Sequence, residues 1–203
     1  MAWLQDRFGR VLLALLVVVG GVWWWQGRPV SQPPGILAPA NPLQTPPVST
    51  ATWRFRDCTL TPLADFDIRA RILSVEHYRF DRAAELSPVD LALGWGPMSD
   101  SQVLQGISIR QSDRWYFWSS STLPISPAEI SSHSANMHMI PATEWVAHRL
   151  SRAKPGQLVH LQGELVRADG KDGWHWVSSL SRLDTGDGSC EVVWVERAEV
   201  SDH

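Results

Sequence analysis

The sequence predicts a mainly β fold with short helices (α+β), arranged as an OB-like small barrel behind one N-terminal transmembrane helix. Residues 65–80 alternate as one long half-buried strand does, with apolar side chains on one parity at Phe66, Ile68, Ala70, Ile72, Tyr78 and Phe80. The elements predicted after it are two small helices, two strands, a helix and two or three strands. An OB barrel also has its helix between the third and fourth strands. An unrelated α+β sheet domain has the same order of elements, so this alternative stays open.

The N-terminus carries the signal for a membrane anchor. Residues 11–25, VLLALLVVVGGVWWW, form an uncharged apolar run that follows Arg7 and Arg10. A cleaved signal peptide is the alternative, but bulky indoles stand where small residues would mark a cleavage site. We therefore interpret residues 1–26 as an uncleaved anchor, with the N-terminus in the cytoplasm by the positive-inside rule. This predicts a single-pass protein of the bacterial inner membrane whose C-terminal domain is periplasmic.

The chain after the anchor divides into a linker and one domain. Residues 27–50 contain seven of the fourteen prolines and almost no charge, which predicts an extended spacer that holds the domain away from the bilayer. Residues 51–203 then form one exported β-rich domain. The net charge of -3 gives no reason to expect a nucleic-acid partner. The expected partners are the membrane, through the anchor, and an envelope protein or a glycan.

Capping patterns predict the helices of the domain. Residues 87–94 predict a short helix, because Ser87 suits an N-cap and Asp90 completes a capping box. Further helical segments are predicted at residues 99–105, from the cap at residue 126, and at residues 143–153. Strands are predicted on either side of Ser112 and Asp113, and at residues 157–168, 173–183 and 190–200. Residues 131–141, SHSANMHMIPA, are predicted to be a connector between two helices.

Four side chains are candidates for hydrolytic chemistry. His133 or His138 would act as a base, with Asp90 or Ser87 as its acidic or hydroxyl partner. These groups meet if the predicted helix at residues 87–94 packs against the histidine-containing segment. No GxSxG elbow or cysteine-protease motif selects among them. An envelope hydrolase is therefore an alternative function.

The same segment contains a set of soft metal ligands. Met137, His138 and Met139 combine two thioethers with an imidazole, a set that suits copper(I). Zinc is not favoured, because His133 and His138 are five residues apart and share neither a helix face nor a strand face. Copper binding is a further alternative, and no cofactor is expected.

Aromatic side chains suggest a binding surface, and two cysteines suggest a disulfide bond. Trp115, Trp174 and Trp176 lie in predicted strands, where indole faces can stack on sugars or bases, although core packing also explains them. Cys58 and Cys190 belong to no CxxC pair, and an exported domain lies where disulfides persist, so we predict a bridge between them. Two buried free thiols are the alternative.

Three segments of the chain, ELSPVDLALGWGPMSD, HSANMHMIPA and GWHWVSSLSRLDTGDGSCEVVWVE, resemble those of a family of short bacterial membrane-anchored proteins. The resemblance runs over most of residues 65–196. It implies an exported bacterial domain behind a single anchor, and it carries no activity, cofactor or catalytic residue to this chain. Together with the missing catalytic motif, it makes a non-enzymatic ligand-binding or protein-binding module the leading hypothesis.

Overall fold

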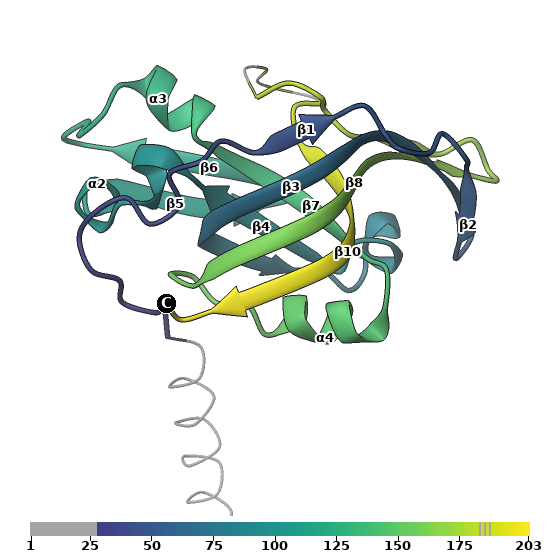
Figure 1. Ribbon diagram of the computed structural model, residues 1–203, viewed down its shortest axis with the longest axis horizontal. Coiled ribbons are helices and arrows are strands. Elements are labelled where there is room, and N and C mark those ends of the chain that lie inside the picture. The colour runs from purple at the N-terminus through teal and green to yellow at the C-terminus, as the bar shows by residue number, and fades with distance from the viewer. Residues whose placement is uncertain (1–27, 183, 185, 187) are drawn as a thin grey trace, which may run out of the picture.

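The computed structural model describes residues 28–182, 184, 186 and 188–203 (Figure 1). The predicted anchor at residues 1–26 lies outside these residues. Within the described part of the chain, no helix has the length and apolar character needed to span a bilayer.

Strands dominate the structure, which confirms the mainly β class. The strands are β1 (Leu43–Thr45), β2 (Trp53–Phe55), β3 (Cys58–His77), β4 (Val89–Gly94), β5 (Ile107–Ser112), β6 (Trp115–Ser120), β7 (Ser134–Pro141), β8 (Leu158–Gly170), β9 (His175–Val177) and β10 (Glu191–Ser201). The helices are short: η1 (Arg82–Glu85), η2 (Gly96–Ser99), α2 (Ser101–Leu104), α3 (Pro127–Ser132) and α4 (Glu144–Ser151).

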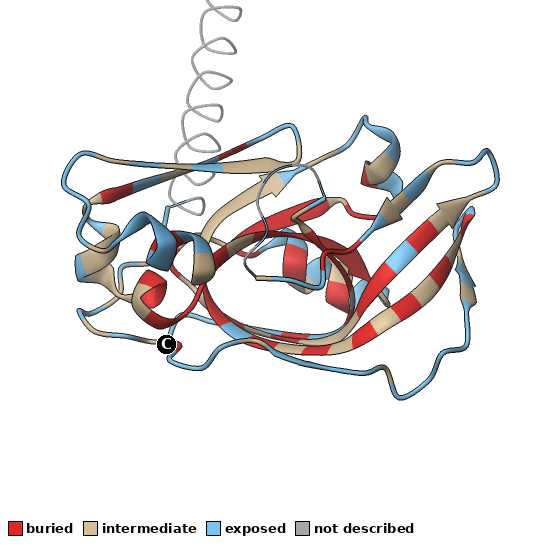
Figure 2. Cartoon of the chain, turned by 90° about the horizontal axis from the view of Figure 1, so that it is seen from above, coloured by how far each residue is buried: buried red, intermediate tan, exposed pale blue. Residues whose placement is uncertain are grey.

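Five strands pair in a succession that returns to its starting point. β3 pairs with β4, β4 with β7, β7 with β10, β10 with β8, and β8 again with β3. Only the β7–β10 pair among these is parallel. Strand β3 joins both ends of the succession because it is 20 residues long and pairs with β8 along its first part and with β4 along its second. Figure 2 shows these strands curving around a buried interior.

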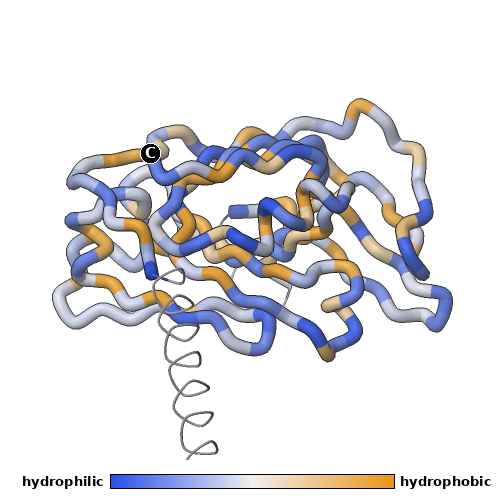
Figure 3. The backbone as a smooth tube through the Cα atoms, turned by 90° about the horizontal axis from the view of Figure 1, so that it is seen from below, coloured by the Kyte–Doolittle hydropathy of each residue, from blue (hydrophilic) through white to orange (hydrophobic). Residues whose placement is uncertain are grey.

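The main core lies inside this ring of strands. Hydrophobic and hydrophilic positions alternate along the strands (Figure 3), and the even-numbered residues of β3 from Ala64 to Ile72 are buried in the core. The predicted parity is therefore confirmed over this range. It is wrong for Phe80, which is 99% exposed, because the register shifts between Ile72 and Ser74 and β3 ends at His77.

Two segments differ from their predictions. Residues 89–94 form the buried strand β4 instead of a helix, and Ser87 and Asp90 direct their side chains into a tertiary network instead of a cap. Residues 134–141 form the central strand β7 instead of a connector. β4 pairs in register along its whole length with residues 134–139 of β7, so the two strands supply backbone partners to each other.

The other capping signals are confirmed. Ser126 and Glu129 form both bonds of a capping box at the start of α3. The side chain of Thr143 accepts a hydrogen bond from the Val146 amide at the start of α4, and Asp100 caps α2 in the same way. These helices are determined by contacts within three residues, which is why the sequence alone predicts them.

The proline-rich segment is bound to the domain and does not extend away from it as predicted. The Val30 amide donates to the Pro155 carbonyl at 2.8 Å, and the Gly96 amide donates to the Ala38 carbonyl at 2.7 Å. Ala38 is part of the main core, and β1 pairs with β3. The described part of the predicted spacer, residues 28–50, therefore belongs to the fold; residues 28–38, its first part, are called the strap below.

Candidate functional site

Three of the four predicted catalytic residues meet in the structure. β4 and β7 pair Asp90 directly with His138, and the Asp90 Oδ2 atom lies 2.9 Å from Nδ1 of His138. Neither atom has a hydrogen-bond partner, so the two side chains are in contact without a hydrogen bond between them. The Ser87 hydroxyl lies 3.4 Å from Oδ1 of the same carboxylate. The predicted convergence is present, but it arises from strand pairing and not from a helix packed on a loop.

Arg114, which the sequence did not indicate, completes this cluster. Its Nη1 atom donates to Asp90 Oδ1 at 2.8 Å and to the Ser87 carbonyl at 2.9 Å. Its Nη2 atom donates to both carboxylate oxygens of Asp81, at 2.9 and 3.0 Å. The guanidinium lies 3.6 Å from the centre of the Tyr78 ring, and Tyr78 accepts a hydrogen bond from the Arg114 amide. The arginine thus fastens the β5–β6 turn to the start of β4.

Burial decides what this cluster can do. The side chain of Asp90 is fully buried, and that of His138 is 3% exposed beneath the Trp176 ring, whose centre lies 4.4 Å from the imidazole. A substrate therefore has no room to contact either side chain. We interpret the cluster as a buried charged tie between the hairpin and the sheet, because a buried carboxylate requires such compensation.

His133 lies apart from this cluster. It ends α3, where its Nδ1 atom lies 3.0 Å from both the Glu129 carbonyl and the Ser132 hydroxyl. Its ring packs on the backbone of Gly96, where an added Cβ would lie 2.6 Å from the imidazole. Gly96 also has a φ of +51°, so the close approach and the backbone conformation both favour glycine there. The structure gives His133 a capping and packing role.

The predicted copper ligands do not converge. Met137 and Met139 are fully buried in the main core, while His138 between them points to the opposite face of β7, as strand alternation requires. These three side chains cannot bind one ion, so the copper prediction is wrong in its geometry. No cluster of three or more His, Cys, Asp or Glu side chains suited to a metal occurs within the described ranges.

The candidate binding tryptophans occupy two places. Trp174 and Trp176 contact each other edge to face, with ring centres 6.1 Å apart, and pack on a second hydrophobic cluster. Arg82 lies 5.1 Å from the centre of the Trp174 ring, and Trp176 covers His138. Trp115, in contrast, lines a pocket.

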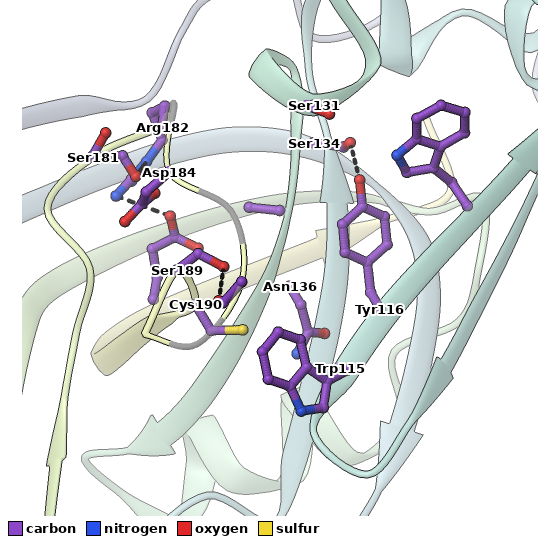
Figure 4. Close-up of a pocket in the computed structure, with 14 residues that line it drawn as sticks. Trp115, Tyr116, Ser131, Ser134, Asn136, Ser181, Arg182, Asp184, Ser189 and Cys190 are labelled. Carbon is purple, nitrogen blue, oxygen red and sulfur yellow. Dashed lines mark hydrogen bonds and ion pairs between the residues drawn. The ribbon is translucent and has the colours of Figure 1, made fainter. Parts of the chain in front are cut away.

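This pocket has a volume of roughly 200 Å³ and lies between the β5–β6 hairpin, the start of β7 and the chain that precedes β10. Figure 4 shows Trp115 and Tyr116 on one side and Arg182, Asp184, Ser189 and Cys190 on the other. The aromatic and polar side chains in its lining are Trp115, Tyr116, Trp118, Ser131, Ser134, Asn136, Ser181, Arg182, Asp184, Ser189, Cys190 and Glu191. Trp118 also packs on a small core beneath the hairpin.

An ion pair lies at the inner end of the pocket. Arg182 Nη2 lies 2.9 Å from Glu191 Oε1, and the Glu191 side chain is 1% exposed. Oε2 of Glu191 and Nη1 of Arg182 are both buried and have no hydrogen-bond partner. Burial raises the pKa of Glu191 to about 8, against the opposing effect of Arg182. Each member of the pair therefore keeps one buried polar atom without a partner beside the pocket.

Hydrogen bonds hold the hairpin against β7. Gln111 donates to Asn136 Oδ1 at 2.6 Å, and Asn136 Nδ2 donates to the Arg114 carbonyl at 2.9 Å. The Tyr116 hydroxyl lies 2.6 Å from the Ser134 hydroxyl, and burial raises the pKa of Tyr116. These bonds fix the aromatic wall of the pocket relative to the sheet.

Cys58 and Cys190 are free thiols in the structure, so the predicted bridge is absent from it. Sγ of Cys58 contacts the Asp57 carboxylate, and Sγ of Cys190 lies 3.9 Å from the Arg114 carbonyl. Burial raises the pKa of Cys58 to about 11 and that of Cys190 to about 12. Neither thiol is activated as a nucleophile.

Comparison with protein families, curated proteins and solved structures finds no match for the chain.

Proposed function

We propose that this chain is a membrane-anchored bacterial envelope protein whose periplasmic domain binds a small polar ligand, in the first place a glycan unit, without chemical turnover. The observation that carries the proposal is the pocket beside Trp115. It combines half-buried aromatic rings with hydroxyl, amide, carboxyl and guanidinium groups. Sugar rings need this combination, because their C–H faces stack on aromatic rings while their hydroxyls require hydrogen-bond partners.

The order of strands supports an OB-like barrel for this domain. The succession β3, β4, β7, β10, β8 matches the order of strands 1, 2, 3, 5 and 4 in an OB fold, with α4 between the third and fourth strands. OB folds bind oligonucleotides and oligosaccharides on the face of strands 2 and 3 and on the loops that join strands 1–2 and 4–5. The pocket here is lined by the third strand, β7, and by the chain that leads into the fifth, β10.

The size and charge of the pocket limit the classes of ligand that it can bind. Drug-sized ligands occupy sites of roughly 300–1,000 Å³, and this pocket, at roughly 200 Å³, fits about one ring of a larger molecule. Asp184 and the Glu191–Arg182 pair give it no excess of positive charge. A neutral or amphoteric sugar unit is therefore favoured over a phosphate-bearing ligand.

The buried state of the Asp90–His138 pair argues against the hydrolase alternative. General base catalysis needs a histidine that can approach a substrate proton within hydrogen-bond distance. His138 has no open approach, and His133 is held by backbone and by Ser132. The copper alternative lacks a converging ligand set. Neither is proposed for this chain.

Calorimetric titration of the full chain in mild detergent with a chito-oligosaccharide tests the proposal. Trp115→Ala should weaken binding about 5-fold to 150-fold, because an aromatic stacking partner contributes roughly 1–3 kcal/mol. Trp145→Ala is the matched control, since Trp145 is 59% exposed on α4 and does not line the pocket. No heat with the wild-type chain would overturn the glycan assignment, and equal binding by both variants would overturn the placement at Trp115.

A further inference from the structure

The strap places one side of the domain next to the membrane, provided that the anchor proposed above is correct. The Val30 amide donates to the Pro155 carbonyl, and Gln32 Nε2 donates to the Gly156 and Asp202 carbonyls, each at 2.8 Å. The beginning of the described chain, the turn between α4 and β8, and the C-terminal end therefore lie together. Figure 1 shows them on the same side of the molecule as α4.

The apolar run and the strap are close in sequence. The run ends at Trp25, and only Gln26 and Gly27 separate it from residue 28. A fully extended chain spans at most about 3.6 Å per residue, so Val30 lies no more than about 18 Å from Trp25. Because Val30 is hydrogen-bonded to the α4–β8 turn, that turn cannot stand far from the bilayer.

The strap packs closely on the domain at Gly156. Gly156 has a φ of +90°, and a Cβ added there would lie 1.9 Å from the Val30 carbonyl oxygen. Further along the strap, the Gly35 amide donates to Asp100 and the Leu37 and Ala38 amides donate to Ser99. The strap is therefore held on the domain from Val30 to Ala38.

The side chains on this side suit an anionic membrane surface. The exposed side of α4 carries Trp145, which is 59% exposed, and Arg149 lies 5.8 Å from its ring centre. Arg152 and Lys154 follow on the turn that holds the strap; the carboxylates near these cations include Glu144 of α4 and Asp202 of the adjoining C-terminal end, and Asp202 accepts a hydrogen bond from Gln157. Tryptophan with neighbouring cations is the composition of a membrane interface, where cations attract anionic headgroups.

We propose that α4 and the α4–β8 turn, residues 144–156, dock on the anionic headgroups of the membrane that holds the anchor. The docked face is opposite to α3 in Figure 1, so α3 and the neighbouring hairpin remain directed away from the bilayer. The pocket, which the hairpin lines, thus stays accessible to a periplasmic ligand.

Maleimide labelling of the full chain in nanodiscs tests this docking. Ser151→Cys places a thiol on the exposed side of α4, and Ala128→Cys places the matched control on α3. Cys58 and Cys190 contribute little background, because burial raises their pKa values to about 11 and 12. Ser151→Cys should react several-fold more slowly in discs that contain phosphatidylglycerol than in detergent, whereas Ala128→Cys should react equally in both.

The outcomes separate this inference from the proposed anchor. If alkaline carbonate releases the wild-type chain from membranes, the anchor and the docking fail together. If the chain resists extraction but Ser151→Cys reacts in discs at its detergent rate, the docking alone is overturned. Reversal of charge at Arg152 and Lys154 (both to Glu) should restore fast labelling of Ser151→Cys; continued slow labelling would overturn the role of the cations.

Discussion

Replacement of Arg114 by methionine tests the interpretation of the buried cluster. The Arg114 side chain is 16% exposed and that of Asp90 is fully buried, so the variant leaves a buried carboxylate without its main cation. Only the Ser87 hydroxyl at 3.4 Å and His138 at 2.9 Å would remain near Asp90. Removal of one partner of a buried pair costs about 3–5 kcal/mol. At roughly 2–4 °C per kcal/mol for a domain of this size, Tm should fall by about 6–20 °C.

Arg82→Met is the matched control for this variant. Arg82 also combines a short ion pair, 2.7 Å to Asp172, with an aromatic ring, that of Trp174. Its side chain and that of Asp172 are 43% and 55% exposed, so its loss should cost no more than about 1 kcal/mol. Thermal unfolding of the full chain in detergent, followed by near-ultraviolet circular dichroism, measures both variants. Adding Asp90→Asn to Arg114→Met should recover about 0.5–3 kcal/mol, because it removes the stranded charge. Equal, small decreases in Tm for Arg114→Met and Arg82→Met would refute the assignment of a buried tie.

Two further predictions concern the strap and the pocket. Gly156→Ala should lower Tm by several degrees more than Gly173→Ala. Both glycines have a positive φ, but only the Cβ added at Gly156 would collide with backbone, that of Val30. Equal decreases in Tm would show that the contact between the strap and Gly156 contributes nothing to stability. Glu191 has a folded pKa of about 8 against an ordinary 4.5, so the folded state retains a proton that the unfolded state loses, and stability should fall as pH rises through this interval. Glu191→Gln should flatten that decline in urea unfolding measured at successive pH values, and an unchanged slope would show that Arg182 compensates the charge of Glu191 fully.

Local signals in the sequence predict the helices well. The caps at Ser126 and Thr143 act through bonds to residues three positions away, so the information lies within one turn. The signal at Ser87 and Asp90 is of the same kind but leads to the wrong element. There the Asp90 carboxylate and the Ser87 carbonyl accept hydrogen bonds from Arg114, 24 and 27 residues away, and residues 89–94 form a strand. A tertiary partner overrides a local preference, and one sequence does not reveal that partner.

The candidate site, like the helices, was predictable from the sequence only in part. The meeting of Ser87, Asp90 and His138 follows from the pairing of β4 with β7, which sequence analysis anticipated only as contact between two segments. The burial of that group was not predictable, because it depends on Trp176 and Arg114 from distant elements. The role of Glu191 was not predictable from the sequence either. Glu191 follows a cysteine in a strand pattern, and nothing in that pattern indicates that one oxygen of its carboxyl group is buried without a partner.

The β5–β6 hairpin explains why a ligand would bind beside the sheet and not on it. The outward face of β4 and β7, which OB folds use for recognition, carries Asp90, Asn136 and His138. Arg114 and Gln111 from the hairpin bond to Asp90 and Asn136 and cover them, and the atoms of this face that keep no partner, Asp90 Oδ2 and His138 Nδ1, are buried out of reach of a ligand. Arg182 and Glu191, in contrast, line the pocket. Under the proposed function, the hairpin covers the face that OB folds use, and the ligand would bind in the adjoining pocket, which Trp115 lines.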